Sequence, residues 1–463
     1  MPLPVTNLPR LPRLTRVGHW LRDHRRAILA LQWLVVTIYA VLLIGPVLLP
    51  LPDETAHLWN HLSVFAQFAF WGIWWPFVLL SMVLLGRVWC GVLCPEGALS
   101  EFASRYARNR PIPRWLRWGG WPFVAFAGTT LYGQMVSVYQ YPQAALLVLG
   151  GSTVAAVGVG LLYTRGKRVW CRYLCPVNGV FALLAKLAPL HFRTEESAWR
   201  AAHRHPLQPV DCAPLLPLRQ LNSASLCHQC GRCSGHRDAI ALAARPPNQE
   251  IVDFGDRYQS GWNTVLLLFG MIGIAMGAFQ WSASPWFIAV KQALAQWLVE
   301  HDILWPLETS APWWLFTHYP AQNDVFSWLD GALLIAYILT TGAVLGGGVS
   351  LVVWLAAYSA GAGDRRGFQH LAQALVPLAG CGLFLGLSAL TVTLLRDEGL
   401  LLLWVSPLRA TLLAGATLWT LWLGWRIGAR YTATPARRIA VVALLGGACA
   451  LIDYGWALLF WLW

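Results

Sequence analysis

The sequence predicts an all-α polytopic membrane protein of about nine transmembrane helices, interrupted by one small polar insert. Of the 463 residues, 57% are hydrophobic and only 12% are charged, which lies outside the usual composition of soluble domains. Apolar runs of about 20 residues, enough to cross roughly 30 Å of hydrocarbon, recur along the chain. We expect spans at 27–50, 62–86, 118–137, 144–164, 259–282, 327–354, 371–395, 400–425 and 438–462.

The basic residues predict the orientation of these spans. The formal net charge is +13, but the arginines sit in alternate loops rather than in one domain. A cytoplasmic N-terminus collects most of them on one side, as the positive-inside rule requires: Arg10, Arg13, Arg16, Arg22, Arg25, Arg26, Arg365, Arg366 and those in 105–117, 165–168 and 426–438. We therefore expect a multi-pass protein of the bacterial inner membrane with its C-terminus outside, in contact with lipid and without a nucleic-acid partner.

Three parts are expected along the chain. Residues 1–190 form a four-span module, residues 191–258 form an insert rich in His, Arg and Pro, and residues 259–463 form a five-span membrane domain. An even number of spans precedes the insert, so it faces the cytoplasm. The glycine-rich stretch GAVLGGGVS in the last part is typical of closely packed membrane helices.

One motif occurs twice in the first part. RVWCGVLCP at 87–95 returns as RVWCRYLCP at 168–176. Two thiolates four residues apart, followed by a proline that turns the chain away, supply half of a four-cysteine site. Two copies related by a rotation about the membrane normal supply all of it. The candidate ligands are Cys90, Cys94, Cys171 and Cys175; the alternative is that they are packing residues at helix ends.

The insert carries LCHQCGRC, in which Cys227, Cys230 and Cys233 have the spacing that wraps a loop around one iron–sulfur cubane. Zinc is the alternative, although a structural zinc site normally takes a second pair of ligands. The fourth ligand must come from elsewhere, and Cys212 is the natural candidate, with a CxxxCP cysteine as its rival. Disulfides are not expected in reduced cytoplasmic loops.

Eight loop cysteines make two sites of four, so two [4Fe-4S] clusters are expected, and the insert is predicted to be a ferredoxin-like iron–sulfur insert. Cys381 and Cys449 lie inside apolar spans and are interpreted as small hydrophobic residues. Arg87 and Arg168 beside the motifs would raise the cluster potentials or anchor the helix ends. A bis-histidine b-type haem is a further hypothesis; its candidate ligands are His57, His61, His301 and His318.

These residues resemble the membrane-bound polyferredoxins of the NapH/NosR type over about residues 25–255. The resemblance rests on WCGVLCP, WCRYLCP, the CxxCxxC run and the trailing AIALAARPPNQEI, which looks like the strand that usually follows such a run. It implies cluster ligation by the motif cysteines and electron passage from membrane quinol toward a periplasmic reductase. The chain departs from the family at Arg237 and Asp238, which replace the fourth Cys-Pro, and in its five C-terminal spans.

The predicted function is an electron-transfer subunit that exchanges electrons between the quinone/quinol pool and a partner redox protein. That partner would be a cytochrome or iron–sulfur subunit, with the periplasm as one location, and the chain would act as a quinol-dehydrogenase-type component of an oxidoreductase complex. An assembly or maintenance factor that reduces the metal centre of another enzyme is the alternative. A transporter with redox-sensing clusters is a third, but its pathway would need intramembrane ionisable residues, of which Asp330 and Asp453 are the few candidates.

Overall fold

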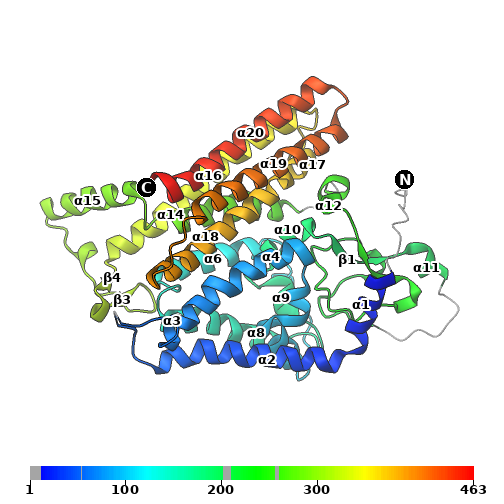
Figure 1. Ribbon diagram of the computed structural model, residues 1–463, viewed down its shortest axis with the longest axis horizontal. Helices are drawn as coiled ribbons and strands as arrows, with labels where there is room; N and C mark the ends of the chain where they lie inside the picture. The colour runs from blue at the N-terminus through cyan, green and yellow to red at the C-terminus, as the bar shows by residue number, and fades with distance from the viewer. Residues whose placement is uncertain (1–11, 54, 202–209, 256–259) are drawn as a thin grey trace. The chain divides into compact units, whose positions relative to one another are not determined.

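The computed structural model describes residues 12–53, 55–201, 210–255 and 260–463, and most of them are helical (Figure 1). Within these ranges, seven helical segments are long and apolar enough to cross a membrane: Arg25–Leu48, Leu62–Leu85, Pro142–Leu162, Gly261–Gln280, Trp328–Ser359, Arg365–Asp397 and Pro435–Leu462. The prediction of a polytopic, mainly α-helical membrane protein is confirmed.

Two of the nine expected spans differ from these seven. Helix α6 (Trp121–Met135) has only 15 residues, fewer than the roughly 20 that a perpendicular crossing needs. Helix α19 (Val405–Tyr431) has 27 residues, but Arg409, Arg426 and several hydroxyl side chains make it less apolar than the others. The count of nine spans therefore stays a prediction.

The described residues form two compact units. Unit 1 takes the described parts of Met1–Val41, Phe77–Trp121 and Ser152–Phe254; unit 2 takes those of Leu42–Pro76, Pro122–Gly151 and Gly255–Trp463. The division at 1–190, 191–258 and 259–463 follows the sequence rather than contacts in space, and it stays a prediction. All eight candidate ligands lie in unit 1.

Unit 1 contains the two motif copies and the insert. Its helices are α1 (Pro12–Asp23), most of α2 (Arg25–Ile44), most of α4 (Trp75–Leu85), α5 (Pro95–Ser104), α8 (Gly151–Leu162), α9 (Val169–Tyr173), α10 (Asn178–Leu184), α11 (Glu196–Ala201) and α12 (Gln249–Phe254). Strand β1 (Leu190–Thr194) pairs antiparallel with β2 (Ile240–Ala244), with Leu190 opposite Ala244 and Thr194 opposite Ile240. The pairing joins the two ends of the insert.

Strand β2 confirms the strand expected after the cysteine run. Strand β1, at the start of the insert, was not predicted from the sequence. Among the described residues the insert has only these two strands, so its ferredoxin-like character stays a prediction.

Unit 2 is a set of packed helices with one short β3–β4 ladder. Its helices are α3 (Leu62–Gln67), α6, α7 (Pro142–Ala145), α13 (Gly261–Val265), α14 (Ala275–Gln280), α15 (Pro285–Glu300), α16 (Trp328–Ser359), α17 (Arg365–Ala372), α18 (Val376–Asp397), α19 and α20 (Pro435–Ala457); its strands are His318–Tyr319 and Asp324–Val325. A Cβ at Gly273 would lie 2.6 Å from the carbonyl oxygen of Gly342. The glycine-rich stretch therefore provides close helix packing, as predicted.

A buried ion pair holds the end of the insert. Arg245 and Glu250 are 5% and 3% exposed, and Arg245 Nη1 lies 2.5 Å from Glu250 Oε2. The same guanidinium donates to the carbonyl oxygens of Ala185, Lys186 and Ala188. These bonds tie the segment after β2 to the segment that follows α10.

Arg245→Ala is expected to destabilise the protein by about 3–5 kcal/mol, because it leaves the Glu250 carboxylate buried without its counter-charge. Denaturant unfolding of the purified protein measures this loss. Arg200→Ala is the matched control, because its partner Glu196 is solvent-exposed and such pairs contribute little. Equal stability of the two variants would contradict the prediction.

A second stability prediction concerns pH. His191 in β1 is 4% exposed, and burial, reinforced by the charge of Arg245, lowers its pKa to about 3. The unfolded chain binds a proton near pH 6.5 while the folded chain does not. Stability is therefore complete above pH 6.5 and is lost as the pH falls toward 3, by about 2 kcal/mol between pH 6.5 and 5. His191→Gln should flatten this acid limb of the unfolding free energy; an unchanged slope would exclude His191 as its origin.

Candidate iron–sulfur centre

Each motif copy closes with the same backbone hydrogen bond. The N–H of Cys94 donates to the carbonyl of Trp89 at 2.9 Å, and the N–H of Cys175 donates to the carbonyl of Trp170 at 3.0 Å. This i to i−5 closure is the π type, which is common at functional sites. In the first copy Cys94 also caps α5, which begins at Pro95. The two copies share this closure, although a π-helix spans Trp89–Leu93 in the first copy and an α-helix spans Val169–Tyr173 in the second.

The four motif cysteines, Cys90, Cys94, Cys171 and Cys175, are called the repeat set. All four are free thiols, two buried and two partly buried. Burial raises the pKa of Cys171 to about 12, and the negative charge of Cys90 contributes to that rise. Burial also raises the pKa values of Cys94 and Cys175, as do their neighbours in the set. The structure therefore brings the thiols of both copies together.

The four cysteines of the insert, Cys212, Cys227, Cys230 and Cys233, are called the insert set. They line one cavity that is partly open to solvent. Cys212 thus lies beside the CxxCxxC loop, although 15 residues separate it from Cys227 in the sequence. Burial raises the pKa of Cys227 to about 12, with Cys230 and Cys212 adding to the rise.

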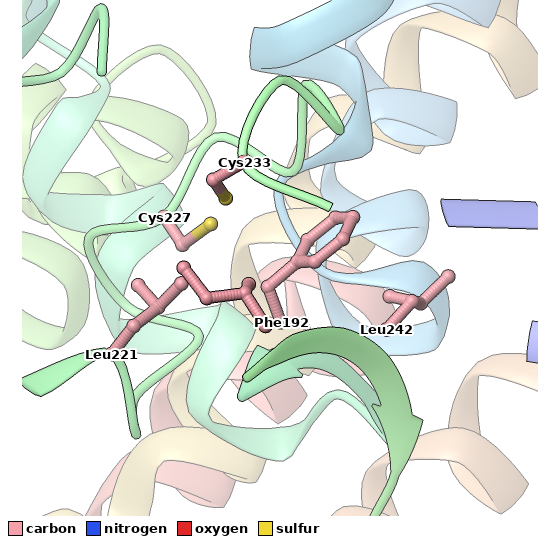
Figure 2. Close-up of a cluster of buried hydrophobic side chains, with 6 residues drawn as sticks. Phe192, Leu221, Cys227, Cys233 and Leu242 are labelled. Atoms are coloured by element: carbon pink, nitrogen blue, oxygen red, sulfur yellow. The ribbon is translucent and has the colours of Figure 1, made fainter. Parts of the chain in front are cut away.

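The floor of this cavity is apolar. Cys227 and Cys233 belong to one buried cluster with Phe192, Leu221, Ile240 and Leu242. Figure 2 shows the side chains of Cys227 and Cys233 directed toward each other, with Phe192 and Leu221 beside them. A water-poor environment of this kind is one of the factors that set the potential of an iron–sulfur cluster.

Hydrogen bonds already reach three of the sulfur atoms. The backbone N–H of Gly97 donates to Cys94 Sγ and that of Gln229 to Cys227 Sγ, each at 3.4 Å. Arg87 Nη2 donates to Cys90 Sγ at 3.6 Å. Donors of this type stabilise thiolates and tune cluster potentials.

The donor set fits a group that binds thiolates and carries net negative charge. Buried, crowded thiols release their protons when a metal centre supplies positive charge. In addition, Arg87 Nε and Arg168 Nη2 are buried polar atoms without a hydrogen-bond partner among the described residues, so within that part of the chain each guanidinium retains a free donor. Among the described residues, no three His, Cys, Asp or Glu side chains converge tightly enough for a single metal ion.

Sequence reasoning missed the carboxylate beside these sites. Glu101 is 6% exposed and accepts a hydrogen bond from Arg168 Nε at 2.8 Å and another from Arg232 of the insert. The first of these arginines precedes Cys171 and the second lies between Cys230 and Cys233. A glutamate six residues after Pro95 of the first CxxxCP motif was the only signal available, and it did not reveal its partners.

Three of the four histidines suggested as haem ligands have other partners in unit 2. His57 Nδ1 lies 3.2 Å from Glu398 Oε2, and His61 Nδ1 accepts the N–H of Ser63. His301 Nδ1 lies 2.8 Å from the carbonyl oxygen of Trp297. The b-type haem stays a prediction, as does a quinone pocket.

Comparison with known families identifies both motif copies. The family described as "4Fe-4S binding domain" matches residues 67–113 and 147–195. These two segments contain the repeat set and exclude the insert set. The chain is therefore a multi-pass membrane protein that carries a 4Fe-4S binding domain.

Individual relatives support the resemblance to the NapH/NosR type. The putative electron transport protein YccM of Escherichia coli (strain K12) is 24% identical over 239 residues, 45% of this chain and 65% of that protein. Regulatory protein NosR of Pseudomonas aeruginosa is 30% identical over 133 residues, and Protein NirI of Paracoccus denitrificans is 31% identical over 137 residues. Those matches cover 25% and 24% of this chain and 19% of each relative. The expected resemblance is confirmed.

The chain thus spans less than two thirds of the length of each of these relatives. No solved structure matches the chain.

Proposed function

We propose that the protein is a membrane-bound iron–sulfur electron-transfer subunit that exchanges electrons between the quinone/quinol pool and a partner redox protein. The observation that carries the proposal is the gathering of eight cysteines into two sets of four within unit 1. The repeat set and the insert set would each hold one [4Fe-4S] cluster. The relative from Escherichia coli is named as an electron transport protein, which agrees with this role.

The chain's own residues would supply the conditions for one-electron transfer. The apolar floor beneath the insert set limits access of water, and the N–H donors at Cys94 and Cys227 stabilise thiolate charge. The buried guanidinium groups of Arg87 and Arg168 favour the more negative, reduced state and so raise the potentials. A bound cluster would accept or release one electron at a time, which suits an intermediate between a two-electron quinol and a redox protein.

We also propose the topology expected from the arginines: a bacterial inner-membrane protein with cytoplasmic N-terminus and cysteine sets, and an external C-terminus. A reporter enzyme that is active only outside the cytoplasm, fused after Trp463, tests the external C-terminus. Activity supports an odd number of spans and the external C-terminus, whereas an inactive fusion that is expressed and inserted supports an even number.

The test of function begins with anaerobic purification in detergent. About eight irons and eight acid-labile sulfides per chain are expected, with EPR signals after dithionite reduction and bleaching of the visible absorption by a short-chain quinol. Zinc without labile sulfide would overturn the cluster assignment. Clusters that dithionite reduces but no quinol reduces would overturn the quinone part alone.

A further inference from the structure

The two cysteine sets meet through backbone at Gly91. A Cβ at this position would overlap the carbonyl oxygen of His228 and lie 2.9 Å from the amide nitrogen of Cys230. Gln32 Nε2 donates to the carbonyl oxygen of Gly91 at 3.0 Å and fixes this loop. The loop between Cys90 and Cys94 therefore lies directly against the loop between Cys227 and Cys230.

Arg168 forms hydrogen bonds to the repeat set and to the residue beside Cys212 of the insert set. It is 1% exposed, its Nη1 donates to the carbonyl oxygen of Cys90, and its backbone N–H donates to the carbonyl oxygen of Ala213, next to Cys212, at 2.9 Å. Its charge acts on the thiols of Cys171 and Cys230. The guanidinium of Arg168 thus contacts the backbone of Cys90 in the repeat set, and its main chain is held beside Cys212 of the insert set.

Arg87 occupies the equivalent position in the first copy and has a similar placement. It is 2% exposed, it donates to Cys90 Sγ of the repeat set, and its Nη1 donates to the carbonyl oxygen of Ser225 in the insert at 2.8 Å. Its charge also acts on Cys171 and Cys227. Since Arg87 and Arg168 each keep a buried N–H that no described residue accepts, each has a donor left for an anionic group.

We propose that Arg87 and Arg168 are positioning residues shared by the two cysteine sets, and that electrons pass directly between the sets across the Gly91 contact. The inference rests on the proposed function. One electron leaves the reduced site, which is oxidised, and enters the other, which is reduced; no bond or proton is transferred. Quinol and the partner redox protein supply and remove electrons. The shared positive charge stabilises an added electron at either site.

The first test is a redox titration monitored by EPR. Arg168→Gln is expected to shift the midpoint potentials of both signals by about 59 mV to more negative values. For a one-electron couple, this shift changes the ratio of oxidised to reduced protein about tenfold at a fixed solution potential. Arg168→Lys retains the charge and should shift each signal less. Arg200→Gln is the matched control: Arg200 pairs with the exposed Glu196, so neither signal should move. A shift confined to one signal in Arg168→Gln would overturn the sharing.

The second test measures the contact itself. Gly91→Ala forces the insert loop away from the repeat loop, because the new methyl group meets backbone atoms that cannot rotate aside. The spin–spin broadening expected when both sites of the native protein are reduced should be lost while iron content is retained. Gly158→Ala adds the same methyl group where, among the described residues, no atom outside its own stretch of helix lies within 4 Å, and it should keep the broadening. Unchanged broadening in Gly91→Ala would overturn the direct route.

The outcomes separate this inference from the proposed function. Native protein without iron and labile sulfide would refute the proposed function. Two intact clusters that titrate independently and show no spin–spin broadening would refute only the shared arginines and the direct electron transfer across the Gly91 contact.

Discussion

Cys230→Ala protein is expected to contain about four irons per chain instead of about eight, with loss of one of two EPR signals. Cys230 lines the insert cavity together with Cys212, Cys227 and Cys233, and removal of one of four thiolates leaves an iron of the cubane without its protein ligand. Iron and sulfide analysis of anaerobically purified protein measures the loss. Cys449→Ala is the matched control, since Cys449 is a buried cysteine of α20 and should retain all of the iron.

A further variant tests Cys212 as the fourth ligand of the insert set. Cys212→Ala should remove the same signal as Cys230→Ala, because both side chains line one cavity. If Cys212→Ala retained the insert signal and a repeat-set variant lost it, the rival assignment to a CxxxCP cysteine would be correct.

Cys171→Ala is expected to remove the other half of the iron and the other signal. Cys171 is 8% exposed and interacts with Cys90, Cys94 and Cys175 of both motif copies, so its loss opens the repeat site. The Cys171→Ala, Cys230→Ala double variant should be nearly free of iron. If Cys171→Ala kept the full iron and sulfide content, the motif cysteines would be packing residues, which is the alternative that the sequence left open.

The sequence was informative where residue spacing itself encodes chemistry. The CxxxCP pair and the CxxCxxC run identify candidate thiolate ligands without any knowledge of packing, and elimination pointed to Cys212. The hydropathy pattern located seven helices long and apolar enough to span a membrane. The shortness of α6 was not predicted, because hydropathy in a sliding window does not register the turn at which a helix stops.

Contacts between distant segments could not be predicted. The buried pair of Arg245 and Glu250, the carboxylate of Glu101 between Arg168 and Arg232, and the approach of Gly91 to His228 each join parts of the chain that are unrelated in sequence. Arginines beside the motifs were interpreted as headgroup anchors or as charge for the clusters; the structure buries Arg87 and Arg168, and their effect on cluster potentials stays a prediction. A single sequence carries no record of these tertiary partners.

The position that is Gly91 in the first motif copy is Arg172 in the second. Two copies of a duplicated gene segment begin identical, yet an arginine at position 91 would collide with the insert loop, and only glycine leaves room for it. The copies have therefore ceased to be interchangeable: exchanging them within the gene would preserve every cysteine and still separate the two sites.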